Sequence, residues 1–233
     1  MTQNDEPKRR FASSPCMASG VADGGTAPVV GDDESARDVA DWRKDERTRL
    51  RAERLAMSVE SRKAAAHALA DQLHSFLERS CGAMRGRVFS AYWPIKGEPD
   101  LRPLMRDLHD AGVTVALPLV EVKQAPLVFR RWTPDTRMVR GDWNIPVPPP
   151  EAEVLTPEVT LAPLVGWDRD GYRLGYGGGY FDRTLAALTP RPFAIGIGLQ
   201  AAEIATIHPQ THDIRLDAIL AEEGVQVVRR AAI

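Results

Sequence analysis

Cysteine is scarce in this sequence: Cys16 and Cys81 are the only two among 233 residues. Two cysteines supply neither a disulfide framework nor a cysteine-rich metal cluster. Apolar runs are short as well, and none approaches the roughly 18 residues that a membrane-spanning helix needs. The basic residues Lys8, Arg9 and Arg10 are not followed by the apolar segment of a secretory signal. We therefore expect a cytoplasmic protein without a membrane partner.

An excess of charge of one sign is also lacking. The chain has 30 Lys and Arg residues against 32 Asp and Glu residues, a formal net charge of −2. This balance gives no general attraction to nucleic acid, so any basic site has to be local and we expect no nucleic-acid partner. Nucleophile motifs are missing too, because no G-x-S-x-G occurs. The histidines lack the spacing of a zinc site.

The composition is that of one folded domain with an extension. An apolar content of 43% suffices for a single substantial core. Residues 1–37 are rich in Gly, Ala, Ser, Asp and Pro, which predicts a disordered leader, with a targeting or partner-binding tail as the alternative. Strand and helix patterns alternate over residues 38–228. This alternation indicates a single α/β domain with a largely parallel, helix-flanked sheet.

The expected elements follow from hydrophobic periodicity and from cap residues. A charged helix is expected over residues 38–57, and Ser58 and Gly82 are expected to cap a second helix. Asp100 is expected to cap a third helix, which Gly112 ends. Strands are expected at residues 87–93, 113–118, 126–132, 159–165, 193–199 and 218–221, with a proline-rich strap at residues 133–158.

The most informative stretch is a glycine-rich loop after the expected strand at residues 159–165. Four of the five residues from Gly175 to Gly179 are glycines, so backbone N–H groups can approach an anion closely. Neither a Walker A loop nor G-x-G-x-x-G fits, because no Lys-Ser/Thr follows and Tyr180 stands at the last glycine position. The helix that follows adds free N–H groups. The pattern predicts a nucleotide-phosphate loop of another kind.

Arg173 and Asp182 flank this loop. Arg173 is suited to neutralise phosphate charge with paired hydrogen bonds, and Asp182 offers the carboxylate oxygens that Mg²⁺ prefers. The simpler alternative is a flexible glycine loop in which Arg173 and Asp182 pair with each other. The first expected helix also carries basic residues on one face, for which a solvated surface is the simpler alternative. These residues are Arg43, Arg47, Arg51 and Arg54.

The segment R-L-G-Y-G-G-G-Y-F-D at 173–182, after P-L-V-G-W-D at 163–168, resembles the signature of the 5-formyltetrahydrofolate cyclo-ligase family. A weaker match is H-D-I-R-L-D at 212–217, and the resemblance covers roughly residues 42–222. It implies an α/β fold and an enzyme of one-carbon folate metabolism. With ATP and Mg²⁺, such an enzyme cyclises 5-formyltetrahydrofolate to 5,10-methenyltetrahydrofolate and releases ADP and phosphate, through a phosphorylated formyl intermediate. The implied partners are these small molecules, and we expect a monomer.

The resemblance also implies roles for particular residues. The implied nucleotide-binding residues are Arg43, Lys44, Arg47, Arg173, Leu174, Gly175, Tyr176, Gly177, Gly178, Gly179, Tyr180 and Phe181. The implied folate-binding residues are Trp93, Glu98, Tyr176, Gly177, Gly178, Gly179 and Tyr180. Arg173 and Tyr180 are the implied catalytic residues, and Asp182 and Asp213 the implied Mg²⁺ ligands. Without the family, Trp93 is more simply a core residue and Glu98 a solvated one.

The sequence departs from the family pattern in two places. In the first helix, the K-x-x-L-R motif has Arg43 in place of Lys and Glu46 in place of Leu, so that Arg47 matches better than Arg43. In the strap, Asn144 and Val147 differ from the G-I-P-E-P of many members. These departures leave open an ATP-dependent enzyme acting on another small substrate. The main alternative from another class is a non-catalytic folate- or nucleotide-binding protein that keeps the fold but sequesters folate. Arg173, the intact glycine run and Asp182 argue against that alternative.

Overall fold

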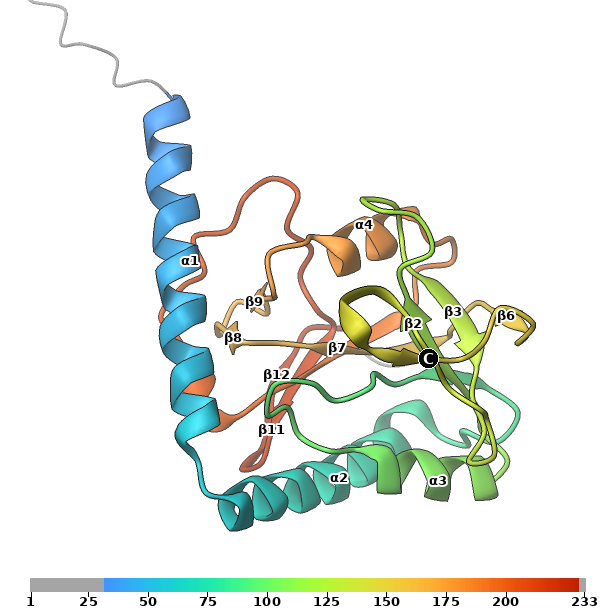
Figure 1. Ribbon diagram of the computed structural model, residues 1–233. Coiled ribbons are helices and arrows are strands. Elements are labelled where there is room, and N and C mark those ends of the chain that lie inside the picture. The colour runs from blue at the N-terminus through green and yellow to red at the C-terminus, as the bar shows by residue number, and fades with distance from the viewer. Residues whose placement is uncertain (1–31, 231–233) are drawn as a thin grey trace, which may run out of the picture.

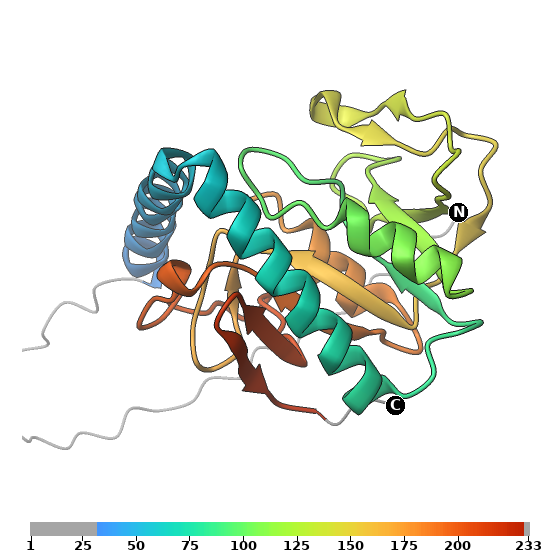
Figure 2. The ribbon, with the colours of Figure 1, turned by 90° about the horizontal axis from the view of Figure 1, so that it is seen from below.

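The computed structural model describes residues 32–230 (Figures 1 and 2). Most of the predicted leader, residues 1–31, therefore lies outside the described residues. Helix α1 (Asp32–Ala56) begins before the predicted start at Asp38, so residues 32–37 are helical. No glycine or proline occurs between Asp32 and Met57, so no helix-breaking residue marks the predicted boundary.

An eight-stranded sheet forms the centre of the protein, in the order β12-β11-β10-β7-β1-β2-β3-β6. The five strands from β11 to β2 run parallel, which confirms the predicted α/β class. Antiparallel pairing adds β12, β3 and β6, so the sheet is mixed. The strands are β1 (Val88–Ser90), β2 (Thr114–Leu119), β3 (Val128–Arg131), β6 (Val154–Leu155), β7 (Val159–Pro163), β10 (Phe193–Ile197), β11 (Ala218–Ala221) and β12 (Gly224–Val228).

Helices cover both faces of the sheet (Figures 1 and 2). Helices α2 (Val59–Cys81) and α3 (Arg102–Asp110) lie on one face, and α4 (Tyr180–Ala187) lies on the other. Strand β10 packs against side chains on both faces of the sheet. Phe193 and Ile195 belong to the larger core cluster, which contains α2 residues, and Ala194 belongs to the cluster that contains α4 residues. A strand covered on both faces is therefore apolar throughout, as predicted for residues 193–199.

Of the four predicted helix ends, Ser58, Gly82 and Gly112 are confirmed, the last with φ +86° just after α3, and Asp100 is wrong. The Ser58 side chain accepts a hydrogen bond from the Ser61 N–H at 3.0 Å, and Gly82 ends α2 with φ +64°. Asp100 is not the N-cap of α3, because Leu101 occupies that position. The Asp100 carboxylate instead accepts hydrogen bonds from the backbone and side chain of Arg102.

The proline-rich strap contains regular structure that its sequence did not reveal. Strands β4 (Val139–Arg140) and β5 (Pro146–Val147) form a small hairpin, and β6 joins the central sheet. Between β4 and β5 lies the 3₁₀ turn η1 (Asp142–Asn144), in which Trp143 and Asn144 have positive φ angles of +53° and +61°. A second 3₁₀ turn is η2 (Gln200–Ala202).

The parallel strands direct their following loops to one edge of the sheet. Strands β1 and β7 are parallel neighbours, so the loop after β1 and the hairpin of β8 (Gly166–Trp167) and β9 (Arg173–Leu174) leave on the same side. Helix α1 runs along this edge (Figure 1). Among the described helices, none has the length and apolar character that crossing a membrane requires.

Candidate active site

Asp168 fixes the turn between β8 and β9. Its carboxylate is 1% exposed, and it accepts hydrogen bonds from the N–H groups of Asp170 at 3.1 Å, Tyr172 at 3.0 Å and Ile207 at 3.0 Å. Because these donors belong to the backbone, one ionised side chain orders the turn and joins it to the segment that leads to Asp213. The turn therefore has a fixed orientation relative to both neighbouring segments.

Asp168→Asn is expected to lower the free energy of unfolding by about 1–3 kcal/mol, because the amide nitrogen would face a backbone donor. Chemical denaturation measures this change. The matched control is Asp170→Asn at the exposed neighbouring position, for which we expect a change within about 0.5 kcal/mol. Equal losses in the two variants would contradict this account of the turn.

Residues 175–181 form the glycine loop and the start of α4. Gly177 and Gly179 have φ angles of +95° and +62°, which glycine adopts without a steric penalty. Within residues 32–230, the amide N–H groups of residues 175–181 donate no hydrogen bond to another protein group. Unpaired amide donors at a helix N-terminus form an anion site. The local geometry therefore supports the predicted phosphate loop.

Two arginines hold the loop by its carbonyl groups. Arg47 Nε donates to the Gly175 carbonyl at 2.7 Å, and Arg183 donates to the Gly178 carbonyl. Arg47 Nη1 and Nη2 have no hydrogen-bond partner in the described part of the chain, and this end of the guanidinium lies beside Gly177. Lys44 is exposed. Arg47 therefore combines a structural contact with free N–H donors, whereas Lys44 has only its position on the helix.

Arg173 and Asp182 pair beside the loop. Arg173 Nη2 donates to Asp182 Oδ2 at 2.9 Å, and the N–H of Ile214 donates to the other carboxylate oxygen at 3.2 Å. Burial lowers the pKa of Arg173, while the negative charges of Asp182 and Asp213 oppose this shift. The pair matches the simpler alternative from the sequence. It coexists with the unpaired loop amides, so the pairing alone does not account for the whole arrangement.

Arg43 fastens α1 to the segment that carries Asp213. Its guanidinium donates to the carbonyls of Ile207 at 2.9 Å and His208 at 2.8 Å and forms an ion pair with Asp213. Burial raises the pKa of Asp213, but the hydrogen bonds from Arg43 and from the Gln210 N–H bring it below its usual range. The guanidinium of Arg43 is thus engaged with protein groups, whereas the resemblance implied a nucleotide contact.

Tyr176 connects α1 with the loop after β1. Its hydroxyl donates to Glu98 Oε1 at 2.7 Å and accepts a hydrogen bond from Arg54 Nη2 at 2.6 Å. The second Glu98 oxygen accepts a hydrogen bond from the Ile95 N–H at 2.8 Å. Glu98 is only 8% exposed, so the solvated alternative for this residue is wrong. The structure therefore brings together two of the implied folate-binding residues.

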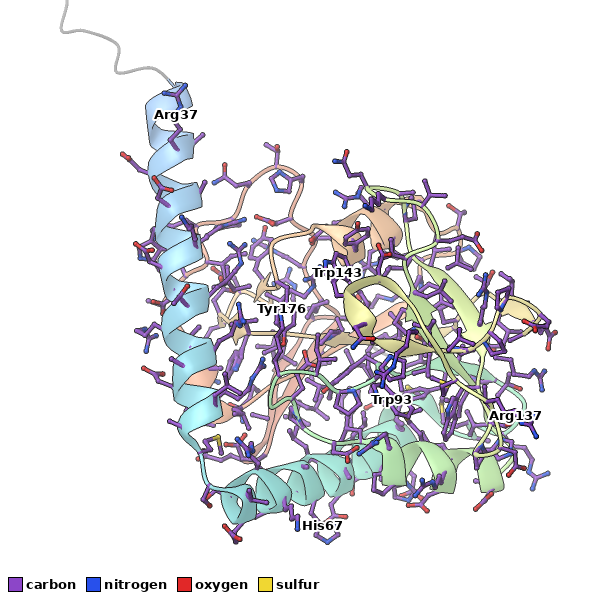
Figure 3. All side chains as sticks on the ribbon, viewed as in Figure 1. Arg37, His67, Trp93, Arg137, Trp143 and Tyr176 are labelled. Atoms are coloured by element: carbon purple, nitrogen blue, oxygen red, sulfur yellow. The ribbon has the colours of Figure 1, made fainter. Side chains whose placement is uncertain are left out.

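Trp93 and Trp143 lie apart from each other (Figure 3). Trp93 is partly buried against the larger core cluster, and the Arg102 guanidinium lies 5.1 Å from its ring centre. Tyr180 contacts Trp143 edge to face at 5.6 Å, and its hydroxyl accepts a hydrogen bond from the Gln124 N–H at 3.4 Å. The exposed Trp143 ring thus belongs to the surroundings of the glycine loop, although it lies in the strap.

The sequence did not single out Arg54, Arg183 or Trp143. Arg54 belongs to the predicted arginine stripe, but nothing in the pattern distinguishes the arginine that reaches a tyrosine from one that reaches solvent. Trp143 lies in a turn with positive φ, a conformation that its residue type does not favour. Across the described residues, no group of three or more His, Cys, Asp or Glu side chains is arranged to hold a metal ion.

A family model and several known proteins match this chain. The model of the 5-formyltetrahydrofolate cyclo-ligase family matches residues 39–222. A 5-formyltetrahydrofolate cyclo-ligase of Mycolicibacterium smegmatis is 30% identical over 62% of this chain and 78% of its own, and one of Haemophilus influenzae is 28% identical over 58% and 76%. The solved 5,10-methenyltetrahydrofolate synthetase of Aquifex aeolicus superimposes with a TM-score of 0.68 at 26% identity, covering 81% of this chain and 93% of that one.

Proposed function

Because the chain belongs to the 5-formyltetrahydrofolate cyclo-ligase family, we propose that it catalyses the ATP-dependent cyclisation of 5-formyltetrahydrofolate to 5,10-methenyltetrahydrofolate, with release of ADP and phosphate. The observation that carries the proposal is the set of unpaired amides at residues 175–181. These amides lie beside Arg47 and Arg173, and Tyr176 of the same loop meets Glu98. The unpaired amides and the hydrogen-bonded pair of Tyr176 and Glu98 therefore lie at one edge of the sheet.

The proposed chemistry has two steps. The formyl oxygen attacks the γ-phosphorus of ATP, and the bond from that phosphorus to the ADP oxygen breaks. N10 of the folate then attacks the activated formyl carbon, loses its proton, and displaces phosphate. Phosphoryl transfer depends on positioning and charge neutralisation more than on a protein nucleophile. The lack of a nucleophile motif therefore fits the reaction.

The phosphates of ATP are assigned to the glycine loop. The amides of residues 175–179 can donate to phosphate oxygens, and the helix dipole of α4 favours negative charge there. Arg47 can add its free Nη1 and Nη2, and the buried Arg173 supplies a fixed positive charge where charge develops on the transferred phosphoryl group. Tyr180 follows the loop, and we assign its ring and hydroxyl to the mouth of the site.

Asp182 and Asp213 would hold Mg²⁺ bound with ATP. Arg173 forms an ion pair with Asp182, and the negative charges of both carboxylates raise the pKa of its guanidinium. Two carboxylates suit Mg²⁺, which usually keeps several waters and takes its other ligands from phosphates. When bound, the metal neutralises charge on the β- and γ-phosphates. In this structure Arg173 and Arg43 neutralise the two carboxylates instead.

The folate is assigned to the pocket around Glu98 and Tyr176. Each Glu98 oxygen accepts one hydrogen bond from the protein, which leaves further lone pairs for the N–H groups of a pterin. Trp93 lies at the end of the same loop but is partly covered by Arg102 and the core. Glu98 is therefore the better supported contact of the two.

Purified protein is expected to convert 5-formyltetrahydrofolate when ATP and Mg²⁺ are present. The near-ultraviolet absorbance of 5,10-methenyltetrahydrofolate follows the product, and ADP release is measured in the same samples. We expect one ADP for each product molecule and no product without ATP. Folate binding without product would instead indicate a sequestering protein, and ATP hydrolysis without product an enzyme with another substrate.

A further inference from the structure

Three segments that are distant in sequence meet at the hydroxyl of Tyr176. Arg54 comes from the C-terminal part of α1, Tyr176 from the glycine loop, and Glu98 from the loop after β1. The hydroxyl accepts from Arg54 and donates to Glu98, so it bridges a cation and an anion. This bridge is the direct polar link between the helix beside the phosphate loop and the proposed folate pocket.

The bridge is buried at both ends. Arg54 is 6% exposed and Glu98 is 8% exposed, and Arg54 Nη1 also approaches the Leu164 carbonyl at 3.4 Å. A buried carboxylate is costly unless hydrogen bonds and an opposite charge compensate for its lost hydration. Glu98 has no ion pair within 4 Å among the described residues. Arg54 reaches it through the phenol, and this arrangement supplies part of that compensation.

Other charged or ionisable groups face Glu98, but their geometry differs. Lys96 and Arg51 lie 5.6 and 5.9 Å from the centre of the Tyr176 ring rather than at its hydroxyl. On the side of α2, a cavity of about 330 Å³ is lined by Glu98 and by further side chains. Those from α2 that carry charge or can titrate are Arg62, Lys63 and His67, while Tyr92 and Asp100 act from the segments around β1 and α3.

We propose that Arg54 is a positioning residue for folate binding: through the Tyr176 hydroxyl it holds the Glu98 carboxylate oriented toward the substrate. This inference rests on the proposed function, because it takes Glu98 as the acceptor for the pterin. It assigns Arg54 to the folate half of the reaction. Of its neighbours on the same helix face, Arg43 donates a hydrogen bond to Asp213 and Arg47 donates one to the Gly175 carbonyl of the glycine loop.

The electrostatics of the pocket agree with this geometry. Burial raises the pKa of Glu98, while the hydrogen bonds from Tyr176 and Ile95 and the charges of Arg54 and Lys96 oppose the rise. Removing the Arg54 charge therefore raises the pKa of Glu98 further. A protonated Glu98 has fewer acceptor sites, so folate binding should fail at a higher pH than in the wild type.

Arg54→Met tests the inference by its effect on pH dependence and on the two substrates separately. We expect the KM for 5-formyltetrahydrofolate to rise by about 10- to 100-fold, with the KM for ATP changed less than about threefold. The acidic limb of kcat/KM for the folate should move upward by about one pH unit. Arg54→Lys keeps the charge and should restore most of the acidic limb.

Arg51→Met is the matched control, because Arg51 and Arg54 lie equally far from the Tyr176 ring centre and only Arg54 reaches its hydroxyl. We expect Arg51→Met to leave the acidic limb in place. Equal increases of both KM values in Arg54→Met, with an unchanged limb, would mean a structural role and overturn the inference. If Arg54→Met does not fold, an unshifted limb in Tyr176→Phe overturns it. A wild type that neither binds nor converts 5-formyltetrahydrofolate would overturn the proposed function itself.

Discussion

Arg173→Met is expected to reduce turnover by about 10²- to 10³-fold, because it removes a fixed positive charge from the proposed site of phosphoryl transfer. Arg173 is buried, and its Nη1 would lie 2.5 Å from a Cβ at position 175, so the glycine there leaves room for the guanidinium. Arg173→Lys should recover little of the loss, because an ammonium group does not reproduce the planar donors of a guanidinium. Steady-state kinetics with saturating ATP measures the effect.

The substitution also leaves Asp182 without its ion pair, so stability has to be separated from catalysis. Chemical denaturation shows how much of Arg173→Met is folded under the assay conditions, and the double variant Arg173→Met/Asp182→Asn, which removes both charges of the pair, should regain stability. Arg169→Met is the control, since Arg169 is exposed and pairs with Glu203. If folded Arg173→Met turned over as fast as Arg169→Met, the role assigned to Arg173 would be wrong.

Asp182→Asn is expected to lower kcat by about 10²-fold and to raise the Mg²⁺ concentration needed for half-maximal rate. The amide keeps the shape of the side chain but loses the charge that a divalent cation requires. A Mg²⁺ titration at fixed ATP gives the kinetic effect. Mn²⁺ binding in the presence of ATP, followed by electron paramagnetic resonance, reports the metal without turnover.

Asp170→Asn provides the matched control for the metal experiment, because Asp170 is an exposed carboxylate at the far end of the β8–β9 hairpin. We expect this variant to have the wild-type Mg²⁺ requirement. Asp213→Asn should weaken Mn²⁺ binding as Asp182→Asn does. An unchanged Mg²⁺ requirement in Asp182→Asn would show that the metal is held elsewhere.

The sequence was sufficient for elements whose signals are local. Helix α2 begins after Ser58 and ends before Gly82, as predicted. The Ser58 side chain caps the first turn, and Gly82 adopts the positive φ that ends the helix. The strands β7, β10 and β11 were predictable because a strand covered by helices on both faces is almost entirely apolar, with the buried Thr160 of β7 as the exception. The glycine loop was predictable because its backbone requires residues without a Cβ.

Features that depend on distant partners were not predictable. Strand β1 ends at Ser90, and no local signal separates it from the apolar residues up to Trp93. The role of Arg54 depends on Tyr176, 122 residues away, and the sequence offers four similar arginines on one helix face. Arg43 forms an ion pair with Asp213, rather than a contact with the glycine loop, because of how α1 docks. In each case tertiary packing selects among residues that look equivalent along the chain.

The docking of α1 has a consequence for the order in which the protein becomes functional during synthesis. Arg43 and Asp213, which close one side of the site, are separated by 170 residues, and Arg47 and Gly175 by 128. Contacts between residues so far apart in sequence close large loops and form late. When only α1 has emerged from the ribosome, Arg43 and Arg47 have no partners, because the segments that carry Asp213 and Gly175 have not yet been made. The proposed nucleotide site can therefore form only when the last third of the polypeptide has emerged.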